Sequence, residues 1–472
     1  MSLLLVCGWF FAAALIAQSP NGTISGFVHD PSGAVIVNAE ILVINDATRV
    51  QYSTRTNVEG IYVVPNVPPG PYRIQVAKIG FKTIIKPDIV LHVQDALAIN
   101  FTLPIGAASE TVTVQGGAPM VDTQDGSVST VIDRSFVESL PLNGRSFNTL
   151  LQLTPGVVIA PTGGFAAGFG EAPGQFSISG QRTDANNFTV DGVSANFGAG
   201  NTTSISPGQA GTGTAQAFSA LGGTSSLVSV EDLQEFRIET SSFAPEFGRT
   251  PGGQVMLTTR SGTNDLHGEV YEYFRNNVLD ANDWFANSLP GSPQAPERHN
   301  DFGGVLGGPI VKNRTFFFLS YEGARLDLPG SQTVEVPSTY ARAQVPSALA
   351  PFLNAYPQPN GQPTSPTAYT APFTGVYSNR GTLDAGSIRI DDTLNNRFSI
   401  FGRYNDAPSQ LANHEDSLNT IQTTDVNTQT LTLGVDMQLS SQMINALRGN
   451  YSTTDADASY SLDSLGGAVP LN

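Results

Sequence analysis

The side chains best suited to chemistry are few in this chain, and they form no catalytic pattern. Two carboxylate pairs, Asp391-Asp392 and Glu415-Asp416, have the oxygen donors that bind a cation or exchange a proton. Both pairs stand at expected strand ends or loops, where solvated charge is the commoner role. The histidines are scattered without a second ligand at metal spacing: His29, His92, His267, His299 and His414. The sequence therefore predicts no enzyme activity, no metal site and no cofactor.

Motifs for nucleotide binding and hydrolysis are missing as well. Gly168, Gly170 and Gly174 have one residue too many for a dinucleotide-binding loop. The chain has no Walker loop, no Gly-x-Ser-x-Gly elbow and no His-Glu-x-x-His motif. Cys7 is the only cysteine and lies in an apolar leader, so a mature chain without the leader would have no disulfide, thiolate metal site or cysteine nucleophile.

Composition narrows the class of protein further. The net charge of -17 and the pI near 4.6 exclude a basic stripe for nucleic-acid phosphates. Charged residues make up 13% of the chain, about half the usual share, beside 48 glycines and 31 prolines. This composition indicates a β-protein with many turns that partly faces lipid or partners.

The N-terminus carries an apolar run, Leu3–Ala17, which has the length of a signal-peptide core and is short for a membrane-spanning helix. We expect a signal peptide over residues 1–17. No Lys or Arg precedes the run, so we expect either that the true start lies upstream or that Met1 is not the native start. The alternative is an anchor helix with a mis-set start.

Residues 18–104 are expected to form a compact β-sandwich, because short alternating runs are separated by turn residues. Seven strands are predicted, at Ile24–Val28, Ala39–Ile44, Gln51–Thr56, Ile61–Val64, Tyr72–Ala77, Phe81–Leu91 and Ala98–Leu103. The motifs Gly26-x-Val28-x-Asp30-x-x-Gly33, Pro69-Gly70-x-Tyr72 and Gly80-Phe81 resemble the carboxypeptidase regulatory-like domain. That domain is an accessory and implies no peptidase activity.

Residues 120–264 predict a mixed domain. Ser135 is expected to cap one short helix, Asn148–Leu153 to form another, and Asp232–Glu239 and Gln254–Arg260 to form strands. The stretch resembles the plug domain of TonB-dependent outer-membrane receptors. The motif residues that carry the resemblance are Ser177, Gly180, Arg182, Asp191, Gly192, Phe247, Gly248, Gly252 and Gly253. It departs from the family at Ser179, where a plug often has arginine, and in the glycine- and serine-rich insertion Ala195–Val228.

Between these two domains lies a linker, residues 105–119, that contains Glu110, Thr111, Val112, Thr113 and Val114. From the residues alone, this run is an inter-domain strand. The resemblance implies instead a segment that adds a strand to a TonB-type periplasmic energising protein.

Residues 265–472 alternate between apolar and polar side chains, most clearly at Arg397–Asn405 and Gln429–Leu439. Water-soluble sandwiches also alternate, but here tight connections regularly follow long ones (276–300, 322–386 and 406–428), as in an outer-membrane barrel. Seven strands are predicted, beginning at Leu266, Asp301, Thr315, Gly386, Arg397, Gln429 and Gln442. Receptors of this family have about 22 strands, so we expect a fragment with an incomplete barrel.

The predicted fold is therefore mainly β: a seven-stranded sandwich, an α+β plug and the first strands of a transmembrane barrel. The resemblance is closest to the Oar-like branch of the family. It implies an outer-membrane receptor, surrounded by lipid, that imports an unknown extracellular ligand (siderophore, glycan or peptide) with inner-membrane energy. Trp284 and Phe285 are candidate ligand contacts. The alternatives are an outer-membrane adhesion or surface-assembly protein without transport, and a secreted carbohydrate-binding sandwich.

Overall fold

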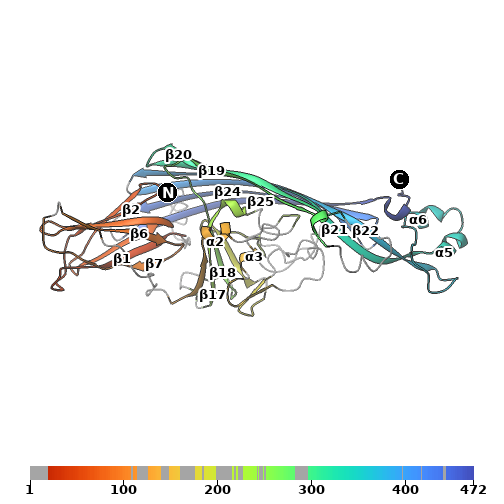
Figure 1. The fold of residues 1–472 in the computed structure, drawn as a ribbon, viewed down its shortest axis with the longest axis horizontal. Helices are drawn as coiled ribbons and strands as arrows, with labels where there is room; N and C mark the ends of the chain where they lie inside the picture. The colour runs from red at the N-terminus through yellow and green to blue at the C-terminus, as the bar shows by residue number, and fades with distance from the viewer. Residues whose placement is uncertain are drawn as a thin grey trace, which may run out of the picture.

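The computed structural model describes most of the chain. The described residues are 20–107, 110–113, 126–139, 148–151, 153–159, 176–182, 185–197, 215–216, 219–221, 227–241, 243, 248, 251–281, 296–395, 397–415, 417–439 and 443–471. They form three parts in chain order: a β-sandwich, a small mixed domain and a long antiparallel sheet (Figure 1).

The N-terminal part is a two-sheet sandwich, as predicted. One sheet pairs β4 (Ile61–Val67), β1 (Gly22–His29) and β7 (Ala96–Ala98), with β8 (Phe101–Thr102) also on β1. The other has the order β3 (Gln51–Arg55), β2 (Glu40–Asn45), β5 (Gly70–Ala77), β6 (Thr83–Leu91) and β9 (Thr111–Thr113). Alternate residues of the two sheets meet in a continuous apolar core.

The last strand predicted for the sandwich, Ala98–Leu103, is two short strands instead. β7 and β8 both run parallel to β1 in the same register, and the pairing is interrupted between them. At the interruption a Cβ on Gly26 would lie 1.9 Å from the Ile99 carbonyl oxygen, so only glycine fits this close approach. The Tyr62 hydroxyl donates to the same carbonyl at 2.7 Å.

The middle part is built on a five-stranded sheet. Its order is β10 (Val128–Ile132), β17 (Leu233–Ser241), β18 (Gln254–Thr259), β13 (Asn187–Val190) and β14 (Val193–Ser194). Around it lie α2 (Arg134–Ser139), α3 (Asn148–Leu151), η4 (Val230–Asp232), β11 (Val157–Ile159), β12 (Phe176–Ile178), β15 (Asn196–Phe197) and β16 (Ala215–Gln216). β18 is buried along its whole length, which explains its continuous apolar and threonine character.

The cap of α2 differs from the prediction. The Asp133 carboxylate accepts from the Phe136 backbone N–H at 3.1 Å and from the Ser135 hydroxyl at 2.6 Å. The helix therefore begins two residues earlier than expected, with Asp133 in place of Ser135 as its cap.

The third part is a seven-stranded antiparallel sheet in which each strand pairs with the next in sequence. Its strands are β19 (His267–Asn276), β20 (Arg298–Val311), β21 (Thr315–Pro337), β22 (Thr370–Asn395), β23 (Phe398–His414), β24 (Thr420–Gln438) and β25 (Ile444–Leu462). All seven predicted strands are present. Within the described residues the sheet is not closed into a barrel.

Four of these strands are much longer than predicted. β21 runs on to Pro337, β22 begins at Thr370 instead of Gly386, β23 runs on to His414, and β24 begins at Thr420 instead of Gln429. Much of the two stretches 322–386 and 406–428, which were expected as long loops, is therefore paired strand. Their buried apolar residues, such as Phe373 and Leu383 on β22, are separated by proline, glycine and polar residues, so these stretches lack the continuous apolar alternation that predicts a strand. The connection from β21 to β22 holds α5 (Thr339–Gln344) and α6 (Ala350–Asn354).

The outer face of the sheet presents a band of large apolar side chains. Val270 is 88% exposed and Leu433 is 54% exposed. The band contains Leu266, Val270, Phe274, Leu306, Leu319, Tyr321, Ile388, Ile390, Ile400, Tyr404, Leu431, Leu433, Leu447 and Tyr451. An apolar surface of this extent is typical of strands that face lipid. Among the described residues, no helix is long and apolar enough to cross a membrane.

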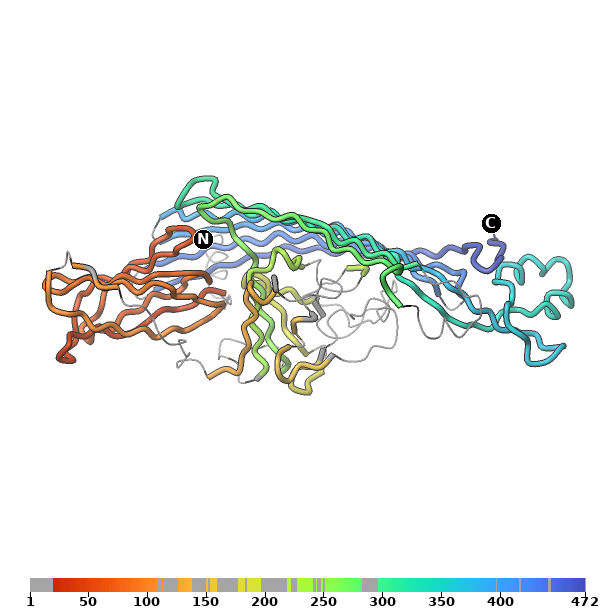
Figure 2. Tube along the Cα trace, in the orientation of Figure 1, coloured from red at the N-terminus to blue at the C-terminus, as the bar shows by residue number. Residues whose placement is uncertain are grey.

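The mixed domain lies against the inner face of the long sheet, and the sandwich lies near one end of it (Figure 1). At the other end the paired extensions of β21 and β22 continue beyond the mixed domain toward α5 and α6. The chain trace in Figure 2 shows the same arrangement without the ribbon.

Candidate functional site

The mixed domain is fixed to the inner face of the sheet by two buried ion pairs. In the first, Arg389 on β22 donates to the Asp191 carboxylate at 3.0 Å and to the Thr259 hydroxyl at 2.8 Å. Asp191 also accepts from the Thr259 backbone N–H at 3.0 Å, so the three groups form one network. Asp191 and Gly192 both have positive φ, which suits the two-residue turn between β13 and β14.

The second ion pair joins Arg403 on β23 to Asp232 in η4 at 3.1 Å. Their side chains are only 2% and 1% exposed. Arg403 also donates to the Leu227 carbonyl at 2.8 Å. Burial raises the pKa of Asp232, and the nearby Arg403 charge opposes this rise. The pair is therefore desolvated, and removal of either partner would leave the other charge buried without compensation.

A third set of contacts fixes the sandwich to the mixed domain. His92 Nδ1 lies 2.9 Å from Glu235 Oε2, and Glu235 also accepts from the Val93 backbone N–H. Two residues further along β17, Arg237 donates to Asp95 at 3.1 Å and to the Val93 carbonyl at 3.0 Å. The hydrogen bond from Glu235 raises the pKa of His92. Because Glu235 and Arg237 alternate along the strand, both face the same turn of the sandwich.

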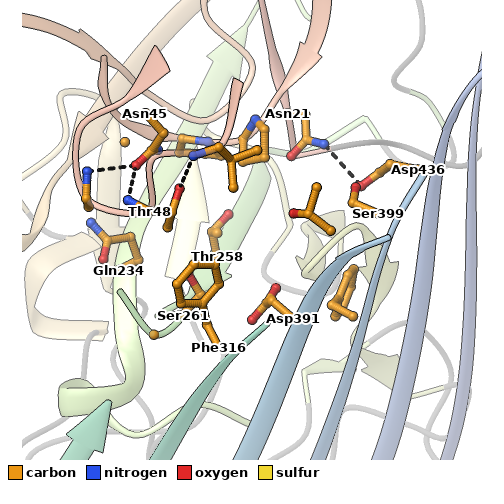
Figure 3. Close-up of a pocket in the computed structure, with 18 of the residues that line it drawn as sticks. Asn21, Asn45, Thr48, Gln234, Thr258, Ser261, Phe316, Asp391, Ser399 and Asp436 are labelled. Carbon is orange, nitrogen blue, oxygen red and sulfur yellow. Dashed lines mark hydrogen bonds between the residues drawn. The ribbon is translucent and has the colours of Figure 1, made fainter. Parts of the chain in front are cut away.

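A cavity of about 230 Å³ lies where the three parts meet. Figure 3 shows Asn45 and Thr48 of the sandwich, Thr258 and Ser261 of the mixed domain, and Asp391 of the sheet around it. Asn21 donates across it to Asp436 at 3.4 Å. The lining mixes carboxylates and arginines that are already paired, so the cavity suits water or a small polar group better than an apolar ligand.

The first carboxylate pair singled out in the sequence is engaged in ion pairs: Asp391 accepts from Arg389 at 2.8 Å and Asp392 from Arg314 at 3.1 Å. Asp416 of the second pair lies outside the described residues. Within the described residues, no cluster of three or more His, Cys, Asp or Glu side chains is placed to hold a metal ion. The contacts described above hold the three parts of the protein together.

The linker segment is part of the sandwich. β9 pairs in parallel with β6, with Thr83 opposite Thr111, Ile84 opposite Val112 and Ile85 opposite Thr113. The Thr83 N–H donates to the Glu110 carbonyl at 2.9 Å, and Lys82 Nζ lies 2.6 Å from the Glu110 carboxylate. The segment is thus an edge strand beside β6.

Three protein families match successive parts of the chain. The carboxypeptidase regulatory-like domain matches residues 23–104, the TonB-dependent receptor plug domain 121–253, and an outer membrane beta barrel domain 258–347 and 341–468. The TonB-dependent transporter Oar of Myxococcus xanthus is 27% identical over 349 residues, which is 68% of this chain. The chain belongs to the Oar-like TonB-dependent receptors. It spans 28% of the length of the Myxococcus protein.

Solved structures of outer-membrane transporters and receptors are similar to the chain at low identity. The outer membrane transporter YddB of Escherichia coli is 15% identical, with a TM-score of 0.47 over 69% of this chain and 38% of its own. The ferric preacinetobactin receptor BauA of Acinetobacter baumannii is 12% identical, with a TM-score of 0.35 over 74% of this chain and 52% of its own. The receptor is an outer-membrane protein, which removes the alternative of a secreted sandwich. Its family is one of transporters and receptors.

The plug-motif residues of this receptor are structural where they are described. A Cβ on Gly252 would lie 2.3 Å from the Ala185 carbonyl oxygen, and one on Gly253 2.3 Å from Ile178. The Ser177 hydroxyl donates to the Gln181 carbonyl at 2.7 Å, Gly180 takes a φ of 75°, and Arg182 is exposed. Gly248 is also exposed. Val114, Phe247, Trp284 and Phe285 lie outside the described residues.

The receptor's interdomain contacts depend on residues that the sequence did not single out. Arg389 and Arg403 stand at polar positions of alternating strands, on the face opposite the apolar band. For both arginines, a charge at a position that faces the barrel interior could have indicated a contact with the plug. Glu235 and Arg237 carry no comparable signal, because a charged pair on a short strand is usually solvated.

Proposed function

We propose that this receptor imports an extracellular ligand across the outer membrane when a periplasmic energising protein pulls on residues 110–114 and displaces the plug. The observation that carries the proposal is the position of the plug against the inner face of a lipid-facing sheet. There it is fixed by the buried pairs Asp191–Arg389 and Asp232–Arg403. A domain so placed obstructs passage beside the sheet, so transport requires work on these contacts.

In this proposal, the position of the sandwich indicates which end of the sheet faces the periplasm and which faces the outside. The tight turns of the sheet lie near the sandwich, since Asn264 donates to the Thr48 carbonyl at 2.7 Å and to the Asn313 side chain at 2.9 Å. This end faces the periplasm, where short turns are usual, and the long β21–β22 extension faces outside. Siderophore receptors among the structural relatives support an iron chelate as the first ligand class to test.

The experiment uses the full-length receptor in its own host. A knockout strain is supplied separately with ferric siderophores, glycans and peptides as the sole iron or carbon source. Complementation with the wild type should restore growth on one of these classes. Complementation with Val112→Pro, which removes a backbone N–H that a paired strand needs, should not. Val112→Ile keeps the strand and serves as the matched control, with outer-membrane amounts checked for each form.

Equal growth of the Val112→Pro and wild-type strains on the transported nutrient would refute the energising role of the segment. Loss of surface attachment in the knockout, with uptake of every nutrient unchanged, would refute import and favour an adhesion protein.

A further inference from the structure

The edge of β6 is already occupied by the segment that the energising protein is proposed to bind. Glu110, Val112 and Thr113 lie exposed on the surface of the sandwich and not in an extended linker. The chain is led to this position by a turn, in which the Lys82 N–H donates to the Pro104 carbonyl at 2.9 Å and the Glu110 N–H to the Ala107 carbonyl at 2.9 Å.

Strand addition uses the backbone N–H and C=O groups of the segment for hydrogen bonds to the partner strand. In a parallel ladder, successive residues direct their N–H and C=O groups to opposite edges. Pairing with β6 therefore occupies one edge of the segment and places the bulk of the sandwich beside it. Recognition by strand addition needs a segment that can align freely with the edge of its partner. A segment paired with β6 has one backbone edge occupied, and it cannot shift freely to align with the edge of another sheet.

The holding interaction is weak enough to be reversible. Three residue pairs and one half-exposed ion pair join the segment to the sandwich. Exposed ion pairs contribute little, and a three-residue ladder makes few hydrogen bonds. The sandwich itself is fixed more firmly to the plug, through Glu235 and Arg237 on β17. The segment, the sandwich and the plug are thus connected in series.

We propose that the β6 edge of the sandwich is a strand-binding site that sequesters residues 110–113, so that the periplasmic energising protein must displace β6 to bind them. This inference rests on the proposed function. The partner is defined by its chemistry: a protein with an open sheet edge that accepts a parallel or antiparallel strand. The accessory sandwich thereby sets how often the receptor is available for energy coupling.

The test is a reversible lock between the segment and β6. Ile85 and Thr113 are opposite each other on the solvent-facing side of the sheet, so Ile85→Cys with Thr113→Cys, in a Cys7→Ser background, allows a disulfide or a short bis-maleimide link. The probe is the purified periplasmic domain of the host's TonB-type protein, titrated against full-length receptor in detergent. Glu40→Cys with Arg55→Cys locks two other strands of the same sheet and is the matched control.

We expect the linked Ile85–Thr113 form to lose binding of the periplasmic domain, and reduction of its disulfide to restore it. The control lock should bind as the wild type does. Lys82→Glu, which repels Glu110 and leaves the fold intact, should tighten binding about twofold, while Lys82→Arg should leave it unchanged.

Unchanged or tighter binding by the linked form would overturn the inference, because the partner would then add to the free edge of β9 without displacing β6. The energising role would survive that result. No binding by the wild type, the control lock or the reduced form would overturn the energising role, and the inference with it.

Discussion

Replacing Arg403 with methionine should loosen the plug more than any other single change on the inner face of the sheet. The substitution keeps much of the side-chain volume but leaves Asp232 buried without its cation, 1% exposed. Removing one partner of a buried pair costs about 3–5 kcal/mol. Asp232 already has a raised pKa because of burial, so without Arg403 it takes up a proton more easily, which limits the cost to the lower end. We therefore expect about 3 kcal/mol near neutral pH.

Hydrogen–deuterium exchange on the full-length receptor measures this loss directly. A destabilisation of about 3 kcal/mol corresponds to roughly 100-fold faster exchange at the amides of β17 and β18. The effect should shrink at acidic pH, where Asp232 is protonated and no longer carries an unpaired charge. Arg403→Met with Asp232→Leu should recover most of the protection, because no charge is then left buried. Arg397→Met changes an exposed arginine just before the same strand and is the control.

Two results would refute this reasoning. Exchange in β17 and β18 that is the same in Arg403→Met and Arg397→Met would mean that the ion pair does not hold the plug. A double variant that exchanges as fast as Arg403→Met would mean that lost packing, and not an unpaired buried charge, causes the effect.

Three further predictions follow from the contacts described above. The hydrogen bond that protonated His92 donates to Glu235 raises the pKa of His92, so this pair stabilises sandwich docking at low pH, and the contribution is lost as the pH rises through the raised pKa. Crosslinking of the sandwich to the plug should therefore fall as the pH rises above the ordinary histidine pKa, and His92→Phe should abolish the pH dependence. Gly252→Ala should destabilise the plug by about 1–3 kcal/mol, seen as earlier thermal unfolding, because its Cβ would meet the Ala185 carbonyl at 2.3 Å, whereas Gly180→Asn, at an open position of positive φ, should not. Leu433→Arg on the apolar band should lower membrane insertion by about 2–4 kcal/mol, measured by folding into liposomes, while Thr423→Arg on the same strand, outside the band, should have little effect.

The elements of the fold follow from local patterns, and the sequence predicts them well. Buried Ile74 and Val76 alternate with less buried residues along β5, and Leu431 and Leu433 share one face of β24, as their period requires. Along β22 before Gly386, buried apolar residues such as Phe373 and Leu383 are separated by proline, glycine and polar residues that usually mark turns, so a paired strand is mistaken for a loop.

The contacts between the parts could not be predicted in the same way. Asp191 and Arg389 are 198 residues apart, and no local pattern relates a turn in one domain to a strand in another. The same holds for the five-residue run 110–114, which contains β9: its composition predicts a strand but not which sheet edge the strand joins. Family resemblance supplied the order of the parts, while the charged residues that fix them to one another are apparent only in the structure.

The length of β22 sets how far from the membrane an incoming molecule first meets this receptor. Its 26 residues span roughly 85 Å at about 3.3 Å per residue, whereas a tilted strand needs only about 9–11 residues to cross the hydrocarbon. The paired ends of β21 and β22 therefore form a long two-stranded ribbon that holds α5 and α6 away from the lipid head groups. In the proposed orientation, a phage, an antibody or a neighbouring cell that approaches this part of the receptor from outside would therefore touch α5 and α6 before it reached the plug (Figure 1).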